Sequence, residues 1–271
     1  MFRTRVITAI ILLLLFAGGL IFLSTGWWAA ALLPLLLAGA WEWAALAGFG
    51  RSGQWGFCLL VLVTGMPVLL AAHYFNSVAI EQTTYWLSAV FWLVCAPSWL
   101  RCGWRVRQPL LLTLTGWLLI VPTWLALVRL QTQPWILLAV LGVVWVADSA
   151  AYFAGRTWGR RKLAPSISPG KTWEGVAGAA AAVAVYHALV WHWGFRGATP
   201  GSGVAAALLV ACLLPLSILG DLFESWIKRQ AGVKDSGTLL PGHGGVLDRI
   251  DALTSTLPLA ALVVPWLIQL A

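Results

Sequence analysis

The sequence has few charged residues, and acidic residues are the scarcest. Only 10% of the 271 residues are charged, nine of them aspartate or glutamate, whereas 61% are hydrophobic. Soluble domains carry about 25% charged residues, so this composition argues against a soluble globular core. Apolar runs of roughly 20 residues recur along the chain, which is typical of a polytopic helical membrane protein.

Cysteine is also scarce, and its spacing excludes two classes of site. The four cysteines, at positions 58, 95, 102 and 212, show neither C-x-x-C spacing nor a histidine partner, so neither a disulfide framework nor a metal–thiolate site is inferred. The net charge of +8 could indicate a nucleic-acid partner, but no RNA-binding signature accompanies it. We expect no nucleic-acid partner, because basic loops in membrane proteins mostly record orientation.

Nine membrane-spanning helices are expected, which makes the fold all-α. They lie at about 6–24, 27–47, 55–75, 83–100, 109–128, 134–154, 174–193, 203–223 and 250–270. The first run follows Arg3 and Arg5 as a signal peptide would, but it is longer than a typical h-region and no A-x-A-like site follows it. We therefore expect it to be a retained span.

The positions of the basic residues predict the orientation. With a cytoplasmic N-terminus, 15 of the 17 lysines and arginines fall in cytoplasmic segments, and only Arg129 and Arg196 fall outside. The expected location is the cell inner membrane. We expect residues 1–130 to form a scaffold of five helices, and residues 131–271 a catalytic region with long cytoplasmic loops at about 155–173 and 224–249. Glu42, beside Trp41 and Trp43, is interpreted as local packing.

The stretch 220–251 concentrates the charge that the rest of the chain lacks. It holds five of the nine acidic and four of the seventeen basic residues: Asp221, Glu224, Asp235, Asp248, Asp251, Lys228, Arg229, Lys234 and Arg249. Ionisable groups near hydrocarbon are costly and indicate function by default, although Lys228 and Arg229 alone would be orientation anchors. Helical spacing places Asp221, Ser225 and Lys228 on one face. Carboxylates that open the last helix can also serve as caps.

Two further segments extend this candidate site. The glycine-rich tip Pro241-Gly242-His243-Gly244-Gly245 lets backbone N–H groups point at an anion, although a loop histidine is the plainer interpretation of His243. The loop at 155–173 supplies Ser168 and Lys171; it is not a P-loop, because Pro165 stands where glycine is required and no strand is expected before it. Asp148 lies inside the sixth run, where pairing with a buried arginine is an alternative to a functional role.

The residue types at this site predict its chemistry. Oxygen ligands without a Cys/His set favour Mg²⁺ over zinc. Carboxylates, Mg²⁺ and basic side chains together are typical of phosphoryl or nucleotidyl transfer.

Residues Ser225-Trp-Ile-Lys-Arg, Lys234-Asp-Ser-Gly and Leu240-Pro-Gly-His-Gly-Gly-Val-Leu-Asp-Arg-Ile-Asp251 resemble the signature of the phosphatidate cytidylyltransferase family. Ser168-Pro-Gly-Lys-Thr-Trp-Glu-Gly and Asp148 are also similar to that family, and the resemblance covers roughly residues 135–270. It implies a Mg²⁺-dependent reaction of CTP with phosphatidic acid in the lipid bilayer, giving CDP-diacylglycerol and pyrophosphate. A second cation and a homodimer stay open.

The expected roles follow from the resemblance and the residue types together. The expected metal ligands are Asp221 and Asp248, then Asp148 and Asp251. The catalytic group comprises Asp221, Asp248, Lys228 and Lys171. The substrate-binding residues are Ser168, Ser225, Arg229, Lys234, Asp235, His243, Gly244, Gly245 and Arg249.

Three other functions share features with this pattern. A CTP-using lipid kinase, similar to the dolichol kinase family, would release CDP instead of pyrophosphate. An ion-coupled transporter would need access from both sides of the membrane, yet the polar clusters are expected on one side only, and no internal repeat supports it. A structural scaffold leaves the clustered charges unexplained.

Overall fold

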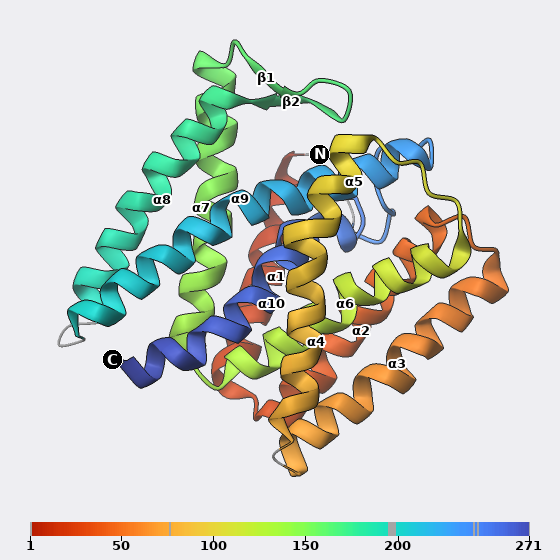
Figure 1. Ribbon diagram of the computed structural model, residues 1–271, viewed down its shortest axis with the longest axis horizontal. Coiled ribbons are helices and arrows are strands. Elements are labelled where there is room, and N and C mark those ends of the chain that lie inside the picture. The colour runs from red at the N-terminus through yellow and green to blue at the C-terminus, as the bar shows by residue number, and fades with distance from the viewer. Residues whose placement is uncertain (1, 76, 195–198, 241, 243, 271) are drawn as a thin grey trace.

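The computed structural model describes residues 2–75, 77–194, 199–240, 242 and 244–270, and it is predominantly helical (Figure 1). The helices are α1 (Phe2–Phe22), α2 (Thr25–Leu46), α3 (Arg51–Tyr74), α4 (Val78–Val90), η1 (Phe91–Cys95), α5 (Ala96–Cys102), α6 (Pro109–Gln131), α7 (Pro134–Trp158), α8 (Trp173–Gly194), α9 (Pro200–Gln230) and α10 (Leu247–Leu270). Two short strands, β1 (Lys162–Ala164) and β2 (Ser168–Thr172), pair antiparallel.

The helices confirm a polytopic all-α membrane protein. Within the described ranges, seven of them are long and apolar enough to cross a membrane: α2, α3, α6, α7, α8, α9 and α10. The other two expected spans correspond to α1, whose described apolar part is shorter, and to the continuous run α4–η1–α5. The total of nine, the cytoplasmic N-terminus and the division into two regions stay predictions.

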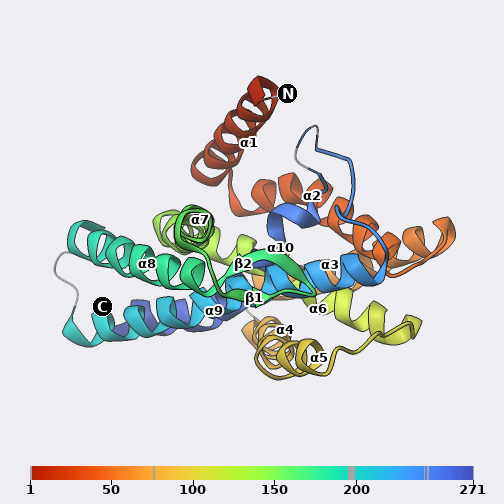
Figure 2. The same ribbon diagram turned by 90° about the horizontal axis from the view of Figure 1, so that it is seen from above.

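Helices α6 and α10 occupy the centre of the molecule (Figure 2). Helix α10 packs against α4, α6 and α9, while α2 packs against α6. Trp43 of α2 lies directly over Gly116 of α6 and donates its indole N–H to the Leu112 carbonyl at 2.9 Å. The hydrophobic core therefore joins both halves of the chain.

Helices α7 and α8 form a close antiparallel pair (Figures 1 and 2). Small residues permit this approach: a Cβ on Gly175 would lie 2.9 Å from the Ala151 carbonyl oxygen, and one on Gly178 would lie 2.4 Å from the Ala154 Cβ. The chain between them folds into the β1–β2 hairpin. The expectation that no strand precedes Lys171 was wrong, because this loop satisfies its backbone groups by pairing with itself.

The run α4–η1–α5 packs against one face of α9 and thereby determines which residues of α9 point away from it. Pro97 has no N–H, and the helix widens into a π-helical turn just before it. Aromatic rings of this run, Phe91, Trp92 and Trp99, surround Phe223 of α9 edge-to-face at centroid distances of 5.4, 5.5 and 5.4 Å. Residues 221 and 225 are directed away from this contact, because they lie about 200° around the helix from residue 223.

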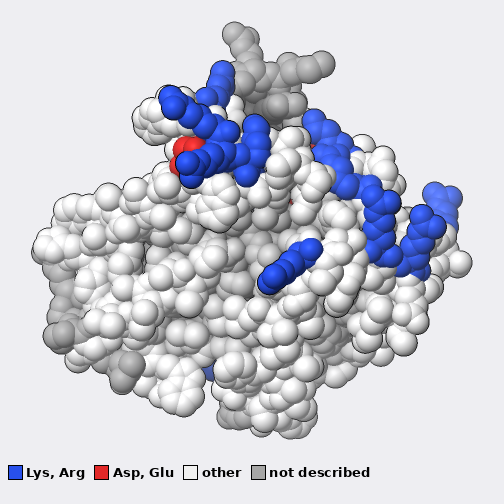
Figure 3. Space-filling model, turned by 45° about the horizontal axis from the view of Figure 1, so that its top comes forward, with Lys and Arg blue, Asp and Glu red and all other residues white. Residues whose placement is uncertain are grey.

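Basic side chains are unevenly distributed over the surface. Figure 3 shows lysine and arginine gathering over the upper part of the face that it presents, while most of that face carries no charge. The two long loops, between α7 and α8 and between α9 and α10, leave their helices at the upper end in Figure 1. Both loops thus lie at one end of the bundle.

Candidate functional site

Helix α9 carries a polar stripe, as its spacing predicts. The Ser225 hydroxyl donates to Asp221 Oδ1 at 3.2 Å, and Lys228 Nζ lies 2.7 Å from Glu224 Oε2. Asp221 is partly exposed, whereas Glu224 is 2% exposed and Lys228 is 9% exposed. The stripe therefore begins at an accessible carboxylate and ends at a buried ammonium group.

Lys228 connects α9 to the start of α10. Its Nζ lies 2.6 Å from Asp248 Oδ1, in addition to its contact with Glu224. The other oxygen of Asp248 accepts backbone N–H groups from Ser236 at 3.0 Å and from Gly245 at 2.8 Å. Asp248 thus holds together the lysine, the helix start and the loop before α10, whose described residues 231–240, 242 and 244–246 we call the signature loop.

The hairpin between α7 and α8 reaches the same place. Lys171 Nζ of β2 lies 2.6 Å from Asp221 Oδ2, with both side chains partly exposed. Asp148 of α7 is exposed on the bundle and lies within electrostatic reach of both Asp221 and Lys171. The expectation that this loop and Asp148 fold against the 220–251 stretch is met.

Asp251 lies at the closest approach of α9 and α10. A Cβ on Gly220 would lie 2.6 Å from the Asp251 carbonyl oxygen and 2.6 Å from the Ser255 hydroxyl, so only glycine fits there. The Asp251 side chain accepts the Ala252 N–H at 2.7 Å and is within electrostatic reach of Asp221 and Glu224. We call Asp148, Asp221, Glu224, Asp248 and Asp251 the acidic cluster.

Glu42 of α2 corrects the sequence-based interpretation. It does not pack locally: its carboxylate accepts the Ser236 hydroxyl at 3.0 Å and the N–H groups of Val246 and Leu247 at 3.0 and 2.8 Å. The side chain is 5% exposed. A buried carboxylate with three donors is stable because its oxygens are satisfied. A helix assigned to the scaffold thereby anchors the signature loop.

The other predicted residues surround this centre at its exposed edge. Ser168 is half-buried in β2, while Arg229, Lys234, Asp235 and Arg249 are exposed. Gly244 has φ +82°, which a side chain would strain, and the Gly245 N–H already serves Asp248. His243 lies outside the described residues.

The donor set fits a hard cation, although the ligands are not assembled. Among the described residues, no three histidine, cysteine or acidic groups converge closely enough to hold a metal ion. One carboxylate oxygen, Glu224 Oε1, is nevertheless buried and has no hydrogen-bond partner in the described part of the chain. Buried polar atoms without partners are uncommon, and a carboxylate oxygen within electrostatic reach of Asp248 and Asp221 is of the kind that suits Mg²⁺.

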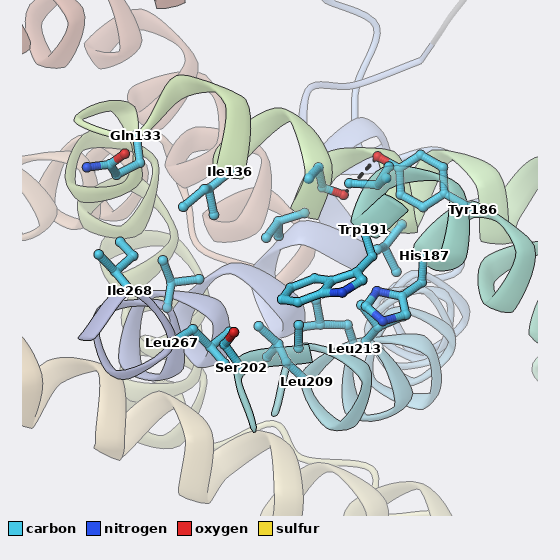
Figure 4. Close-up of a pocket in the computed structure, with 17 residues that line it drawn as sticks. Gln133, Ile136, Tyr186, His187, Trp191, Ser202, Leu209, Leu213, Leu267 and Ile268 are labelled. Atoms are coloured by element: carbon cyan, nitrogen blue, oxygen red, sulfur yellow. Dashed lines mark hydrogen bonds between the residues drawn. The ribbon is translucent and has the colours of Figure 1, made fainter. Parts of the chain in front are cut away.

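An apolar cavity of about 260 Å³ lies between α7, α8, α9 and α10 (Figure 4). Its lining includes Val143, Tyr186, Trp191, Ala206 and Leu213, and the described lining residues include no Lys, Arg, Asp or Glu. It lies toward the end of these helices away from the acidic cluster. Without charged groups it does not suit a phosphate, but its surface suits a hydrocarbon chain.

Sequence reasoning missed two members of the network, Glu42 and Glu224. Glu42 is the only acidic residue within the first five expected spans, and that isolation in hydrocarbon was the available signal. Glu224 is adjacent to the predicted stripe, but helical spacing alone gives it no role. The structure buries it between Lys228 and the other acids.

Comparison with known proteins gives consistent matches over the whole chain. A family model described as the cytidylyltransferase family matches residues 3–267. A Pseudomonas aeruginosa protein named phosphatidate cytidylyltransferase is 39% identical over 277 residues, covering 96% of each chain. A Haemophilus influenzae protein of the same name is 34% identical over 280 residues, covering 95% of this chain and 96% of its own.

Proposed function

Because the chain belongs to the cytidylyltransferase family, we propose that it transfers the cytidylyl group of CTP to phosphatidic acid. The products are CDP-diacylglycerol and pyrophosphate. The observation that carries this proposal is the convergence of the acidic cluster with Lys171 and Lys228 at one end of a membrane bundle. A lipid phosphate and a soluble nucleotide can meet only at such a boundary.

In the proposed reaction, an oxygen of the lipid phosphate attacks the α-phosphorus of CTP, and pyrophosphate leaves. The attacking phosphate monoester is already ionised near neutral pH, since its second pKa is near 6. The protein therefore needs no general base. It has to bring two polyanions together in line, which is a task of positioning and charge stabilisation.

The two lysines are suited to different parts of that task. Lys171 is 24% exposed on a hairpin, so its ammonium group can reach an incoming nucleotide from the aqueous side. Lys228 is buried and fixed by two carboxylates, so its charge is held in place before substrate binds. We assign Lys171 to the CTP phosphates and Lys228 to the charge that develops during transfer.

We propose Mg²⁺ as the cofactor, held by Asp221, Asp251 and Glu224. These three residues are within electrostatic reach of one another, and Glu224 Oε1 has no partner in the described structure. Asp248 and Asp148 remain proposed ligands from the sequence, although Asp248 is engaged by Lys228 and two backbone N–H groups. A bound Mg²⁺ would neutralise phosphate charge and polarise phosphoryl oxygens.

The membrane assignment is multi-pass, and we propose the inner membrane with the acidic cluster facing the cytoplasm. The two long loops emerge at one end of the bundle, where basic residues gather (Figures 1 and 3). Cytoplasmic loops carry the excess of lysine and arginine. CTP and pyrophosphate would then exchange with the cytoplasm while the lipid tails stay in the bilayer.

The test is an assay of purified full-length protein in mixed micelles with CTP, phosphatidic acid and Mg²⁺. We expect pyrophosphate and CDP-diacylglycerol in equal amounts, with Asp221→Asn as the inactive control. Release of CDP with phosphorylation of the lipid would instead identify a CTP-using kinase. If neither product forms with any phospholipid acceptor, the proposed function is wrong.

A further inference from the structure

The signature loop is shaped around the carboxylate of Glu42. A Cβ on Gly237 would lie 2.4 Å from Glu42 Oε1, and one on Gly245 would lie 2.4 Å from Oε2. Two glycines of the loop are thus in direct contact with this side chain, in addition to its three hydrogen bonds. The loop backbone could not take this course around a larger or displaced group.

The hydrogen bonds continue from Glu42 to Lys228. The Ser236 hydroxyl donates to Glu42 and accepts the Asp248 N–H at 3.3 Å, while the Ser236 N–H donates to Asp248 Oδ2 at 3.0 Å. Asp248 Oδ1 in turn lies 2.6 Å from Lys228 Nζ. One chain of polar contacts therefore links α2, the signature loop, α10 and α9.

The negative charge of Glu42 suits the place where it acts. Two of its donors lie at the N-terminus of α10, where a helix favours an anion: the N–H group of Leu247, the first helical residue, and that of Val246 just before it. An amide in its place would have one acceptor oxygen and would face these donors with an NH₂ group. The signature loop would then shift, and Asp248 and Lys228 would shift with it.

We propose that Glu42 is a positioning residue, which acts through Ser236 and Asp248 to hold Lys228 where the transferred phosphate is stabilised. This inference rests on the proposed cytidylyl transfer. It assigns part of the site to the N-terminal half, outside the segment that carries the family signature. Glu42 itself does not touch substrate.

The test compares Glu42→Gln with Glu81→Gln in the micelle assay. Glu81 is a matched control, because it is also a buried glutamate of the N-terminal half, 4% exposed, but the hydrogen bond that it accepts from the Tyr85 hydroxyl stays within α4. We expect Glu42→Gln to lower kcat by about 10²-fold, the cost of a displacement of about 1 Å in a catalytic group. Because the loss is confined to the transition state, kcat and kcat/KM should fall equally. Glu81→Gln should stay within about twofold of the unaltered protein, since its glutamine retains the acceptor oxygen.

A double-mutant cycle with Ser236→Ala tests the connection. The effects of substitutions within one hydrogen-bond network are not additive. The double variant Glu42→Gln/Ser236→Ala should therefore lose little more activity than Glu42→Gln alone. The thermal unfolding temperature of Glu42→Gln and its monodispersity in detergent should match those of Glu81→Gln. If Glu42→Gln does not fold, Ser236→Ala alone should still lower kcat at least about tenfold without changing KM.

Three results would overturn the inference: a Glu42→Gln kcat within about threefold of the unaltered protein, equal losses in both glutamine variants, or additive effects in the cycle. Each presupposes an active unaltered protein. If that protein shows no cytidylyl transfer, the proposed function fails instead, and the two failures are therefore distinguishable.

Discussion

Gly220 sets the distance between the two helices that carry most of the acidic cluster. In Gly220→Ala the added methyl group would lie 2.6 Å from the Asp251 carbonyl oxygen, about 0.8 Å closer than the 3.4 Å at which ordinary contacts begin. Its neighbours are backbone and a short hydroxyl, not the end of a flexible side chain, so α9 and α10 must separate by about that amount. Overpacking of this kind costs about 1–3 kcal/mol of stability.

The same displacement moves Asp221 relative to Asp251. A shift of about 1 Å in a catalytic group can cost about 10²-fold in rate, so Gly220→Ala should lose most turnover while the protein still folds. The assay is pyrophosphate release in micelles, with thermal unfolding followed in parallel. Gly56→Ala on α3 is the control, because a Cβ there meets nothing within 4 Å. A Gly220→Ala enzyme as active as the control would refute the close packing at this point.

Three further predictions test other parts of the site. Lys228→Met leaves Glu224 and Asp248 buried without their partner and should lower the free energy of unfolding by about 3–5 kcal/mol as well as reduce turnover. Lys171→Met breaks a partly exposed pair and should lower the free energy of unfolding by at most about 1 kcal/mol while still reducing turnover. Denaturant titration of both variants would show equal losses of stability if burial does not matter. Removing divalent cations with EDTA should abolish turnover reversibly, and turnover that persists in EDTA would exclude the cofactor. Asp251→Asn should raise the Mg²⁺ concentration needed for half-maximal rate by at least about tenfold. Ala206→Trp fills the apolar cavity and should lower turnover of long-chain phosphatidic acid several-fold while leaving turnover of a short-chain analogue unchanged. Equal effects on both lipids would show that no acyl chain enters the cavity.

Hydropathy and helical spacing predicted the parts of this molecule that depend on local sequence. The membrane helices follow from apolar runs, and the Asp221–Ser225 contact follows from spacing along one helix. The Lys171–Asp221 pair joins residues 50 positions apart: the sequence predicted that the loop at 155–173 lies against the 220–251 stretch, but it did not predict this ion pair. Spacing along the sequence could not show which charged group contacts which partner.

The contacts of Glu42 and Asp248 depend on tertiary packing instead. Glu42 meets a loop about 200 residues away because α2 packs on α6, and α6 packs on α10. Asp248 was expected as a metal ligand from its residue type, but the course of the signature loop gives its oxygens to Lys228 and two N–H groups. The β1–β2 hairpin likewise depends on the close approach of α7 and α8, which brings its ends together.

The balance of charge in the cluster gives a physical reason why a cation belongs to the proposed reaction. Five carboxylates of the acidic cluster face two lysines, and Lys228 is already shared between Glu224 and Asp248. CTP and phosphatidic acid are themselves anions, so the carboxylates of the cluster oppose the approach of both substrates. A divalent cation between the carboxylates would offset much of that negative charge, and Glu224 Oε1 lacks a partner in the described structure. Glu42 does not add to the repulsion in the same way, because three donors and the start of α10 compensate its charge.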